Sequence, residues 1–175
     1  LGTYPSCLGQ EAFSTSIGYA MNADDVFVPY YRDAAALYLR GVRLSQLLQL
    51  WGGDERGNSF EGNARQDLPI NVPIATQITH AAGIATAFKT RSQKRAVVVT
   101  CGDGATSRGD FYEALNLTGV WQLPLVCIVN NNQWAISVHQ SLQTSCDSIA
   151  QKAEAAGIPG IQVDGNDATA VYTAT

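Results

Sequence analysis

Two apolar, β-branched segments that each end in a polar turn constrain the fold of this chain most strongly. Residues 96–101 read Ala-Val-Val-Val-Thr-Cys and lead into Gly102–Gly104, whereas residues 124–129 read Pro-Leu-Val-Cys-Ile-Val and lead into Asn130–Asn132. Both segments are predicted to be buried strands of a parallel sheet. The helical stretch at 110–119 lies between them and predicts a crossover connection, so the sequence favours an α/β fold.

The polar turns after these two strands predict a binding site. Open α/β sheets bind ligands at the carboxyl ends of their strands, where Asp103 and Asn132 would lie. Carboxylate and amide oxygens are ligands that Mg²⁺ or Ca²⁺ accepts together with phosphate oxygens. Gly102 and Gly104 would let a ligand approach the backbone closely, and the amino end of the helix at 110–119 suits an anion. The pattern therefore predicts a metal–phosphate site.

The rest of the chain continues the alternation of helices and strands. Hydrophobic spacing predicts helices at 10–21, 33–40, 45–51, 74–89 and 146–156, a helix start at 168–174, and strands at 26–28 and 160–163. Asp33 and Ser45 are the expected helix caps, and residues 52–72 are expected to form a long loop. We expect one domain over residues 1–175, with a parallel sheet and helices on both of its faces.

Composition excludes several classes of function. The net charge of −4 and the lack of a Lys/Arg cluster argue against a nucleic-acid partner. No apolar run reaches transmembrane length and no signal peptide is recognisable, so no membrane association is expected. The four cysteines lack Cys-x-x-Cys spacing, which disfavours a zinc site, and we expect a cytoplasmic protein with reduced thiols. Only 15% of the residues are charged, which hints at surface that is buried against partners.

The turn at Gly102–Gly104, followed after residues 105–130 by Asn131-Asn132, resembles the thiamine diphosphate signature. Residues 102–113 and 131–137 are similar to the alpha subunit of the decarboxylating component of 2-oxo acid dehydrogenase complexes, of the pyruvate or branched-chain type. Further similar stretches are 9–12, 29–33, 73–77 and 163–167. The resemblance implies the thiamine diphosphate-binding fold, with thiamine diphosphate and Mg²⁺ as cofactors. Because members of that family are longer at both ends, we expect the sequence to be part of a longer subunit.

The resemblance also implies a set of metal ligands. Asp103 and the side-chain amide of Asn132 would bind Mg²⁺ directly, and Trp134 would offer its backbone carbonyl. Gly102, Gly104 and Ala105 would touch the diphosphate through their main chain.

Four residues outside this turn are implied to face the cofactor. Tyr31 and Arg32 follow a predicted strand, and the guanidinium of Arg32 would pair with the diphosphate. Val72 and Ile74 would contact the aminopyrimidine ring. The equivalents of Asn71, Pro73, Thr76 and Gln77 hold a monovalent cation in branched-chain members.

Several polar residues near these motifs receive no catalytic role. His80 is expected to be a packed or capped residue of an Ala-rich helix, and no role is assigned to His139. Tyr4 is a candidate for the substrate pocket. In this family the glutamate that activates the cofactor comes from the beta subunit, so no catalytic residue is predicted in this chain.

The implied reaction is the decarboxylation of pyruvate or a branched-chain 2-oxo acid, followed by acyl transfer to a lipoyl group. The implied partners are a homologous beta subunit, two alpha with two beta, and the lipoyl-bearing acyltransferase of the complex. Without a beta subunit the chain is expected to be inactive. Two alternatives stay open: an alpha subunit of an acetoin-cleaving thiamine-dependent enzyme, and a non-catalytic fragment that keeps only the fold. Residues 3–6 contain no histidine, which leaves the substrate open, whereas the stretches at 31–33 and 131–137 argue against a transketolase-like enzyme.

Overall fold

The computed structural model describes residues 4–175, and the chain divides into two compact units. Unit 1 combines the chain up to Val72 with Val163–Thr175, and unit 2 comprises Pro73–Gln162. No helix within residues 4–175 is long and apolar enough to cross a membrane.

Unit 2 is built on the parallel strands β2 (Val97–Gly102) and β3 (Leu125–Asn130), which pair in register along their whole length. The prediction of an α/β fold with a parallel sheet is confirmed. The first five residues of β2 are fully buried, whereas β3 is only half-buried, contrary to the prediction of two buried strands. The predicted strand at 160–163 is also wrong. Ile161 is 70% exposed there, and the segment joins no hydrogen-bonded ladder.

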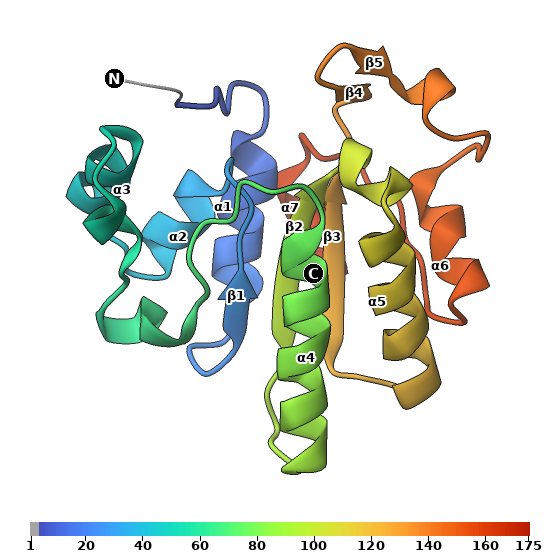
Figure 1. The fold of residues 1–175 in the computed structure, drawn as a ribbon, viewed down its shortest axis with the longest axis horizontal. Coiled ribbons are helices and arrows are strands. Elements are labelled where there is room, and N and C mark those ends of the chain that lie inside the picture. Colours follow the sequence, from blue (N-terminus) through green and yellow to red (C-terminus); the bar gives the residue numbers. More distant parts are fainter. Residues whose placement is uncertain (1–3) are drawn as a thin grey trace. The chain divides into compact units, whose positions relative to one another are not determined.

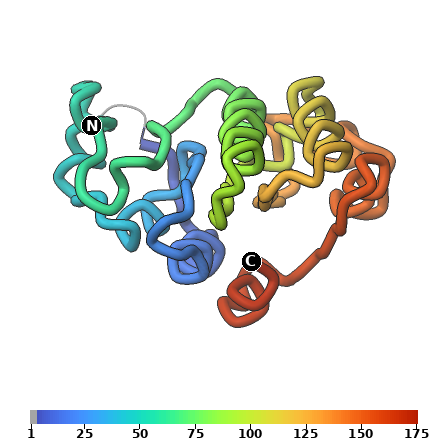
Figure 2. Tube along the Cα trace, turned by 90° about the horizontal axis from the view of Figure 1, so that it is seen from below, coloured from blue at the N-terminus to red at the C-terminus, as the bar shows by residue number. Residues whose placement is uncertain are grey.

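Helix α4 (Thr76–Thr90) of unit 2 packs against these strands. It contacts β2 and β3 and lies beside α5 (Gly109–Trp121), as Figures 1 and 2 both show. Small buried residues of α4, including Ala81, Ala82 and Ala85, allow this close packing. The helix predicted at 146–156 is shorter than expected, because only α6 (Lys152–Ala155) and the preceding 3₁₀ turn Ile149–Gln151 are helical.

A hairpin that the sequence analysis did not predict follows β3. It consists of β4 (Trp134–Ala135) and β5 (Val138–His139), which pair antiparallel, and leads into the 3₁₀ turn Gln140–Leu142. Its connection places Ile136 at φ 58°, a backbone conformation that β-branched residues rarely adopt. Figure 1 shows the hairpin beyond the carboxyl ends of β2 and β3.

Unit 1 is mainly helical. Helix α1 packs against α2 and α7, and α3 packs against the first of two 3₁₀ turns within the predicted loop at 52–72. Asp33 is the N-cap residue of α2, as predicted, but its carboxylate accepts the backbone N–H of Tyr30 and makes no capping hydrogen bond to the helix. The second expected cap, Ser45, lies inside α3, which begins at Leu44. The elements of unit 1 are α1 (Glu11–Ala20), β1 (Val26–Val28), α2 (Ala34–Leu39), α3 (Leu44–Trp51) and α7 (Ala168–Ala174).

A buried ion pair holds the loop of unit 1 to its helices. The guanidinium of Arg40 donates from Nε and Nη2 to the two carboxylate oxygens of Asp67, at 2.6 and 2.9 Å. The same carboxylate accepts the backbone N–H of Phe27, and Arg40 also donates to the carbonyl of Asp25. Burial raises the pKa of the Asp67 carboxyl, while the hydrogen bonds from Arg40 and from Phe27 oppose that rise.

Candidate functional site

The carboxyl ends of β2 and β3 bring the predicted metal ligands of unit 2 to one edge of the sheet. Gly102 and Asn130 are register partners at the ends of the two strands. Asp103 follows as the first residue of the 3₁₀ turn η3 (Asp103–Ser107), and Asn132 leads into the hairpin. Strand β4 of that hairpin contacts η3, so both segments belong to one local cluster.

Asp103 is a buried carboxylate that has no cationic partner. Its residue is 3% exposed, and its Oδ2 accepts a hydrogen bond of 3.2 Å from Nε2 of Gln143. No Lys, Arg or His of residues 4–175 lies within ion-pair distance of it. An ionised carboxylate is costly to bury without compensation, which makes this position suited to a bound cation.

Backbone geometry directs the other two predicted ligands to the same edge of the hairpin. The side-chain Oδ1 of Asn132 accepts the backbone N–H of Trp134 at 2.9 Å. Trp134 pairs with His139, and the adjacent Gln133 carbonyl accepts the N–H of Gln140, so Trp134 occupies a non-hydrogen-bonded position of the ladder. Its N–H and carbonyl therefore both point away from β5, towards the side that carries the Asn132 amide.

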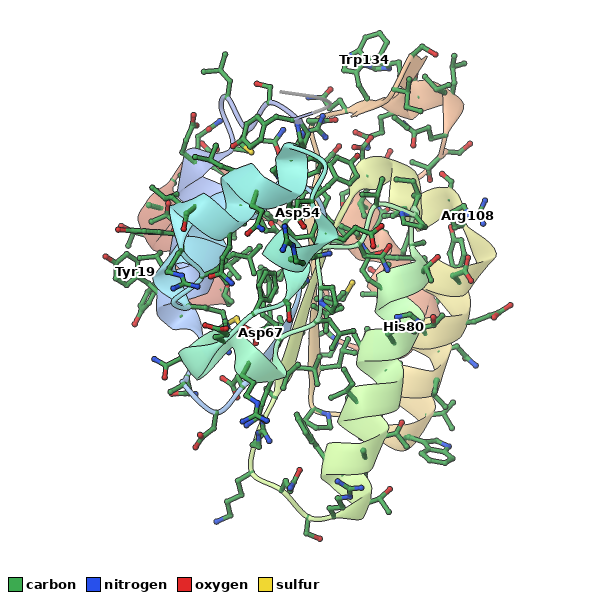
Figure 3. The ribbon with its side chains drawn as sticks, turned by 60° about the vertical axis from the view of Figure 1, so that its left-hand side comes forward. Tyr19, Asp54, Asp67, His80, Arg108 and Trp134 are labelled. Carbon is green, nitrogen blue, oxygen red and sulfur yellow. The ribbon has the colours of Figure 1, made fainter. Side chains whose placement is uncertain are left out.

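The indole of Trp134 itself is not needed for this arrangement. It is 53% exposed, packs edge-on against His139 and lies on the outside of the hairpin in Figure 3. A role through the backbone carbonyl is therefore compatible with the geometry.

Two glycines of the turn have opposite surroundings. A Cβ added at Gly102 would meet no atom within 4 Å, whereas one added at Gly104 would lie 2.6 Å from the Cβ of Ala135 in β4. Gly102 therefore leaves open space beside the backbone, as a closely approaching ligand requires, and Gly104 allows the hairpin to pack on η3. Ala105 is buried within the same turn.

Lys152 stabilises this turn through hydrogen bonds, a role that the sequence analysis did not predict. Its residue is 5% exposed, and its ammonium donates to the carbonyl of Thr106 at 2.8 Å and to the hydroxyl at 3.0 Å. The Thr106 hydroxyl in turn bonds the backbone carbonyl of Asp103. The ammonium also lies 5.3 Å from the ring centroid of Tyr112.

The predicted diphosphate residues Tyr31 and Arg32 belong to unit 1. Arg32 donates from Nε to the carbonyl of Ser6 at 2.9 Å and from Nη1 to the Tyr31 hydroxyl at 3.4 Å. Its guanidinium also stacks on the Tyr31 ring. Within the described residues no carboxylate pairs with Arg32, so its charge remains for an anion.

The predicted ring contacts are exposed apolar side chains. Val72 in unit 1 is 58% exposed and Ile74 in unit 2 is 43% exposed. Val72 also borders a pocket of about 600 Å³ whose walls include Trp51 and Ile70. Tyr4, the candidate for a substrate pocket, packs edge-on against Trp51, with ring centroids 6.0 Å apart.

Two residues of the predicted monovalent-cation set keep an unsatisfied oxygen. Oδ1 of Asn71, in unit 1, and Oε1 of Gln77, in unit 2, are each buried without a hydrogen-bond partner among the described residues. Buried amide oxygens of this kind are normally bound by a donor, a water or an ion. Thr76 begins α4, and Pro73 is exposed.

The two histidines lie outside this chemistry. His80 is exposed on α4, as Figure 3 shows, so the prediction of a packed helix residue is wrong; its side chain falls on the outer face of the helix. His139 shares a hydrogen bond of 2.9 Å with the Ser141 hydroxyl through Nδ1. Residues 4–175 contain no group of three or more His, Cys, Asp or Glu side chains that could hold a metal ion.

The residues present fit Mg²⁺ and a diphosphate. The candidate donors are the buried carboxylate of Asp103, which has no counter-charge among the described residues, the amide oxygen of Asn132 and the carbonyl of Trp134. All three are hard oxygen donors, of the kind that Mg²⁺ accepts together with phosphate oxygens and water. The open space at Gly102 allows a phosphate to approach the backbone.

Comparison with known sequences gives a consistent family. A family model described as "Dehydrogenase E1 component" matches residues 1–175. The chain is 40% identical to the pyruvate dehydrogenase E1 component subunit alpha of Staphylococcus aureus, over 100% of this chain and 47% of that protein. It is 39% identical to the Mycoplasma genitalium protein of the same name, over 95% of this chain and 46% of the relative. It is 41% identical to the Acholeplasma laidlawii protein of that name, over 99% of this chain and 50% of the relative. The chain thus spans about half the length of these relatives.

Comparison with solved structures supports the fold. Transketolase from Leishmania mexicana superposes with a TM-score of 0.69 at 20% identity, covering 94% of this chain and 32% of the other. This similarity indicates a shared fold and is too distant in sequence to indicate more.

Proposed function

We propose a function on the basis that this chain belongs to the family of dehydrogenase E1 components. In this proposal it binds Mg²⁺ and the diphosphate of thiamine diphosphate as part of the alpha subunit of a 2-oxo acid dehydrogenase. The observation that carries the proposal is the buried carboxylate of Asp103 at the carboxyl end of β2, which has no cationic partner among residues 4–175. When bound, thiamine diphosphate supplies the electron sink for decarboxylation.

The candidate site residues of unit 2 each have a defined task in this proposal. Asp103, the amide oxygen of Asn132 and the carbonyl of Trp134 would hold the metal. The backbone of Gly102, Gly104 and Ala105 would contact the diphosphate.

Further residues, in each unit by itself, are proposed to face the cofactor. Arg32 is held by Ser6 and Tyr31 in an orientation that leaves its charge for phosphate oxygens. Val72 and Ile74 offer apolar surface to the aminopyrimidine ring. The unsatisfied side-chain oxygens of Asn71 and of Gln77 are each, within their own unit, proposed donors to a monovalent cation.

The proposed reaction is decarboxylation of pyruvate and transfer of the acyl group to a lipoyl arm. Pyruvate is favoured over a branched-chain substrate because relatives at 39–41% identity carry the name pyruvate dehydrogenase. The chain contributes binding groups, and a beta subunit would complete the catalytic centre. The lipoyl-bearing acyltransferase is the proposed acceptor partner.

The experiment uses the full-length protein assembled with its beta subunit. Reduction of an artificial electron acceptor is followed with pyruvate, a branched-chain 2-oxo acid or acetoin, with Mg²⁺ and thiamine diphosphate present. We expect pyruvate to be preferred and Asp103→Asn to lower the rate by at least about 100-fold, since losing a metal ligand should exceed the 10–100-fold effect of losing an outer partner. Asp147→Asn, at an exposed loop position, is the matched control. Full activity of Asp103→Asn would refute the proposed site.

A further inference from the structure

Gln143 occupies an unusual position between the buried carboxylate and the hairpin. Its Nε2 donates to Oδ2 of Asp103 at 3.2 Å and to the backbone carbonyl of Val138 in β5 at 3.0 Å. The backbone carbonyl of Gln143 also accepts the hydroxyl of Ser107, at the end of η3, at 3.5 Å. One side chain therefore ties the carboxylate to the strand that pairs with β4.

These contacts use both N–H groups of one amide on two different acceptors. A primary amide has two donors, and both are directed here at oxygens that cannot donate in return when Asp103 is ionised. Oδ2 of Asp103 is thereby engaged, whereas Oδ1 accepts no hydrogen bond from the part of the chain that the structure describes and can bind another ligand. Carboxylates that bind metals are commonly fixed in this way by an outer hydrogen bond.

The hydrogen bond from Gln143 to the Val138 carbonyl stabilises the hairpin. Val138 pairs with Ala135, which lies directly against Gly104. A two-stranded hairpin is only marginally stable on its own, so an added tie at Val138 helps to fix the backbone that carries Asn132 and Trp134.

We propose that Gln143 is a positioning residue for the metal site: it orients the Asp103 carboxylate and holds the β4–β5 hairpin, with Asn132 and Trp134, beside it. This inference rests on the proposed Mg²⁺ site. Removal of the two N–H donors should weaken metal binding about 10–100-fold, as for other outer partners of metal ligands.

The substitution Gln143→Met separates hydrogen bonding from packing. Methionine has a similar length and volume but no donor, so a packing role predicts little change and a positioning role predicts a clear loss. Gln143 is only half-buried on a surface loop, and the folded core should survive the change. Gln143→Ala is a second variant that removes both the donors and the bulk. Gln151→Met is the matched control, because exposed Gln151 also bonds a loop backbone group, the N–H of Asp147.

The experiment measures Mn²⁺ binding by electron paramagnetic resonance in the presence of thiamine diphosphate, on the full-length protein with its beta subunit. We expect the dissociation constant of Mn²⁺ to rise about 10–100-fold in Gln143→Met and Gln143→Ala and to stay unchanged in Gln151→Met. Hydrogen exchange of the Gln140 amide, which bonds the Gln133 carbonyl across the hairpin, should accelerate in the same two variants.

The results distinguish failure of the proposed role of Gln143 from failure of the proposed metal site. Loss of Mn²⁺ binding in Asp103→Asn with wild-type affinity in Gln143→Met would overturn the role of Gln143 and leave the metal site standing. Unchanged Mn²⁺ binding in Asp103→Asn would overturn the metal site, and the role of Gln143 with it.

Discussion

The substitution Gly104→Ala should uncouple cofactor binding from folding. A Cβ at this position would lie 2.6 Å from the Cβ of Ala135, whereas two carbons normally approach to about 3.5–4.0 Å, so one side must move by roughly 1 Å. Gly104 does not have a positive φ, so alanine is conformationally acceptable there. The effect of Gly104→Ala therefore depends only on the steric clash with Ala135.

The change in the free energy of unfolding depends on whether the turn or the hairpin moves to relieve the clash. Overpacking costs about 1–3 kcal/mol in a rigid core, and replacing glycine by alanine recovers about 0.4–1 kcal/mol from the unfolded chain. Ala135 sits on a short, largely exposed hairpin that can shift, so we expect the free energy of unfolding to change by no more than about 1 kcal/mol. The displaced hairpin carries Asn132 and Trp134 away, and the affinity for Mg²⁺ and thiamine diphosphate should fall at least about tenfold, or 1.4 kcal/mol.

The assay is calorimetric titration of thiamine diphosphate into Mg²⁺-saturated full-length protein with its beta subunit, beside urea unfolding. Ala135→Gly removes the opposing Cβ, so the double variant Gly104→Ala/Ala135→Gly should recover most of the lost affinity. Gly83→Ala, on α4 with open space around it, is the matched control and should only stabilise the helix. Wild-type affinity in Gly104→Ala, or no recovery in the double variant, would refute the steric reasoning.

The remaining predictions concern the turn and the two buried cations. Gly102→Ala should leave the urea midpoint unchanged or higher, because its Cβ meets no atom, yet weaken thiamine diphosphate binding in calorimetry; equal affinity would show that no ligand approaches there. Arg40→Met should lower the free energy of unfolding by about 3–5 kcal/mol at pH 7, since it leaves Asp67 buried without its partner. The folded-state pKa of Asp67 is raised, so between its ordinary value near 3.8 and the folded value the unfolded chain binds fewer protons. Stability of Arg40→Met should therefore rise as the pH falls through that window, and urea unfolding at a series of pH values that shows no such rise would contradict the assignment. Lys152→Met should cost about 1–3 kcal/mol in urea unfolding through the lost bonds to Thr106, and a loss below 0.5 kcal/mol would argue against the support of η3.

The site could be predicted from sequence where its residues are neighbours of patterned strands. The β-branched run before Gly102 fixes β2, and the position of Asp103 follows from the end of that strand. The burial of β3 was overestimated because an apolar run does not reveal which strands flank it. The expected strand at 160–163 fails for the same reason, since a ladder needs a partner that the local pattern does not specify.

Other features depend on contacts between distant residues. Gln143 meets Asp103 across 40 positions of the chain, and Lys152 meets Thr106 across 46. Both look like ordinary polar residues of a loop and of an alanine-rich helix. The hairpin was missed because its turn places Ile136 at positive φ instead of the Asn-Gly or Asp-Gly pair that usually signals such turns.

The most direct test of the proposed metal–diphosphate site is a crystal structure of the full-length protein with its beta subunit, Mn²⁺ and thiamine diphosphate, recorded with anomalous scattering from manganese. The predicted result is one anomalous peak, from a manganese ion that is coordinated by a carboxylate oxygen of Asp103, Oδ1 of Asn132 and the carbonyl oxygen of Trp134. A bound cofactor whose manganese is held by other residues, with the side-chain carboxylate of Asp103 bonded to Gln143 and not to the metal, would contradict it.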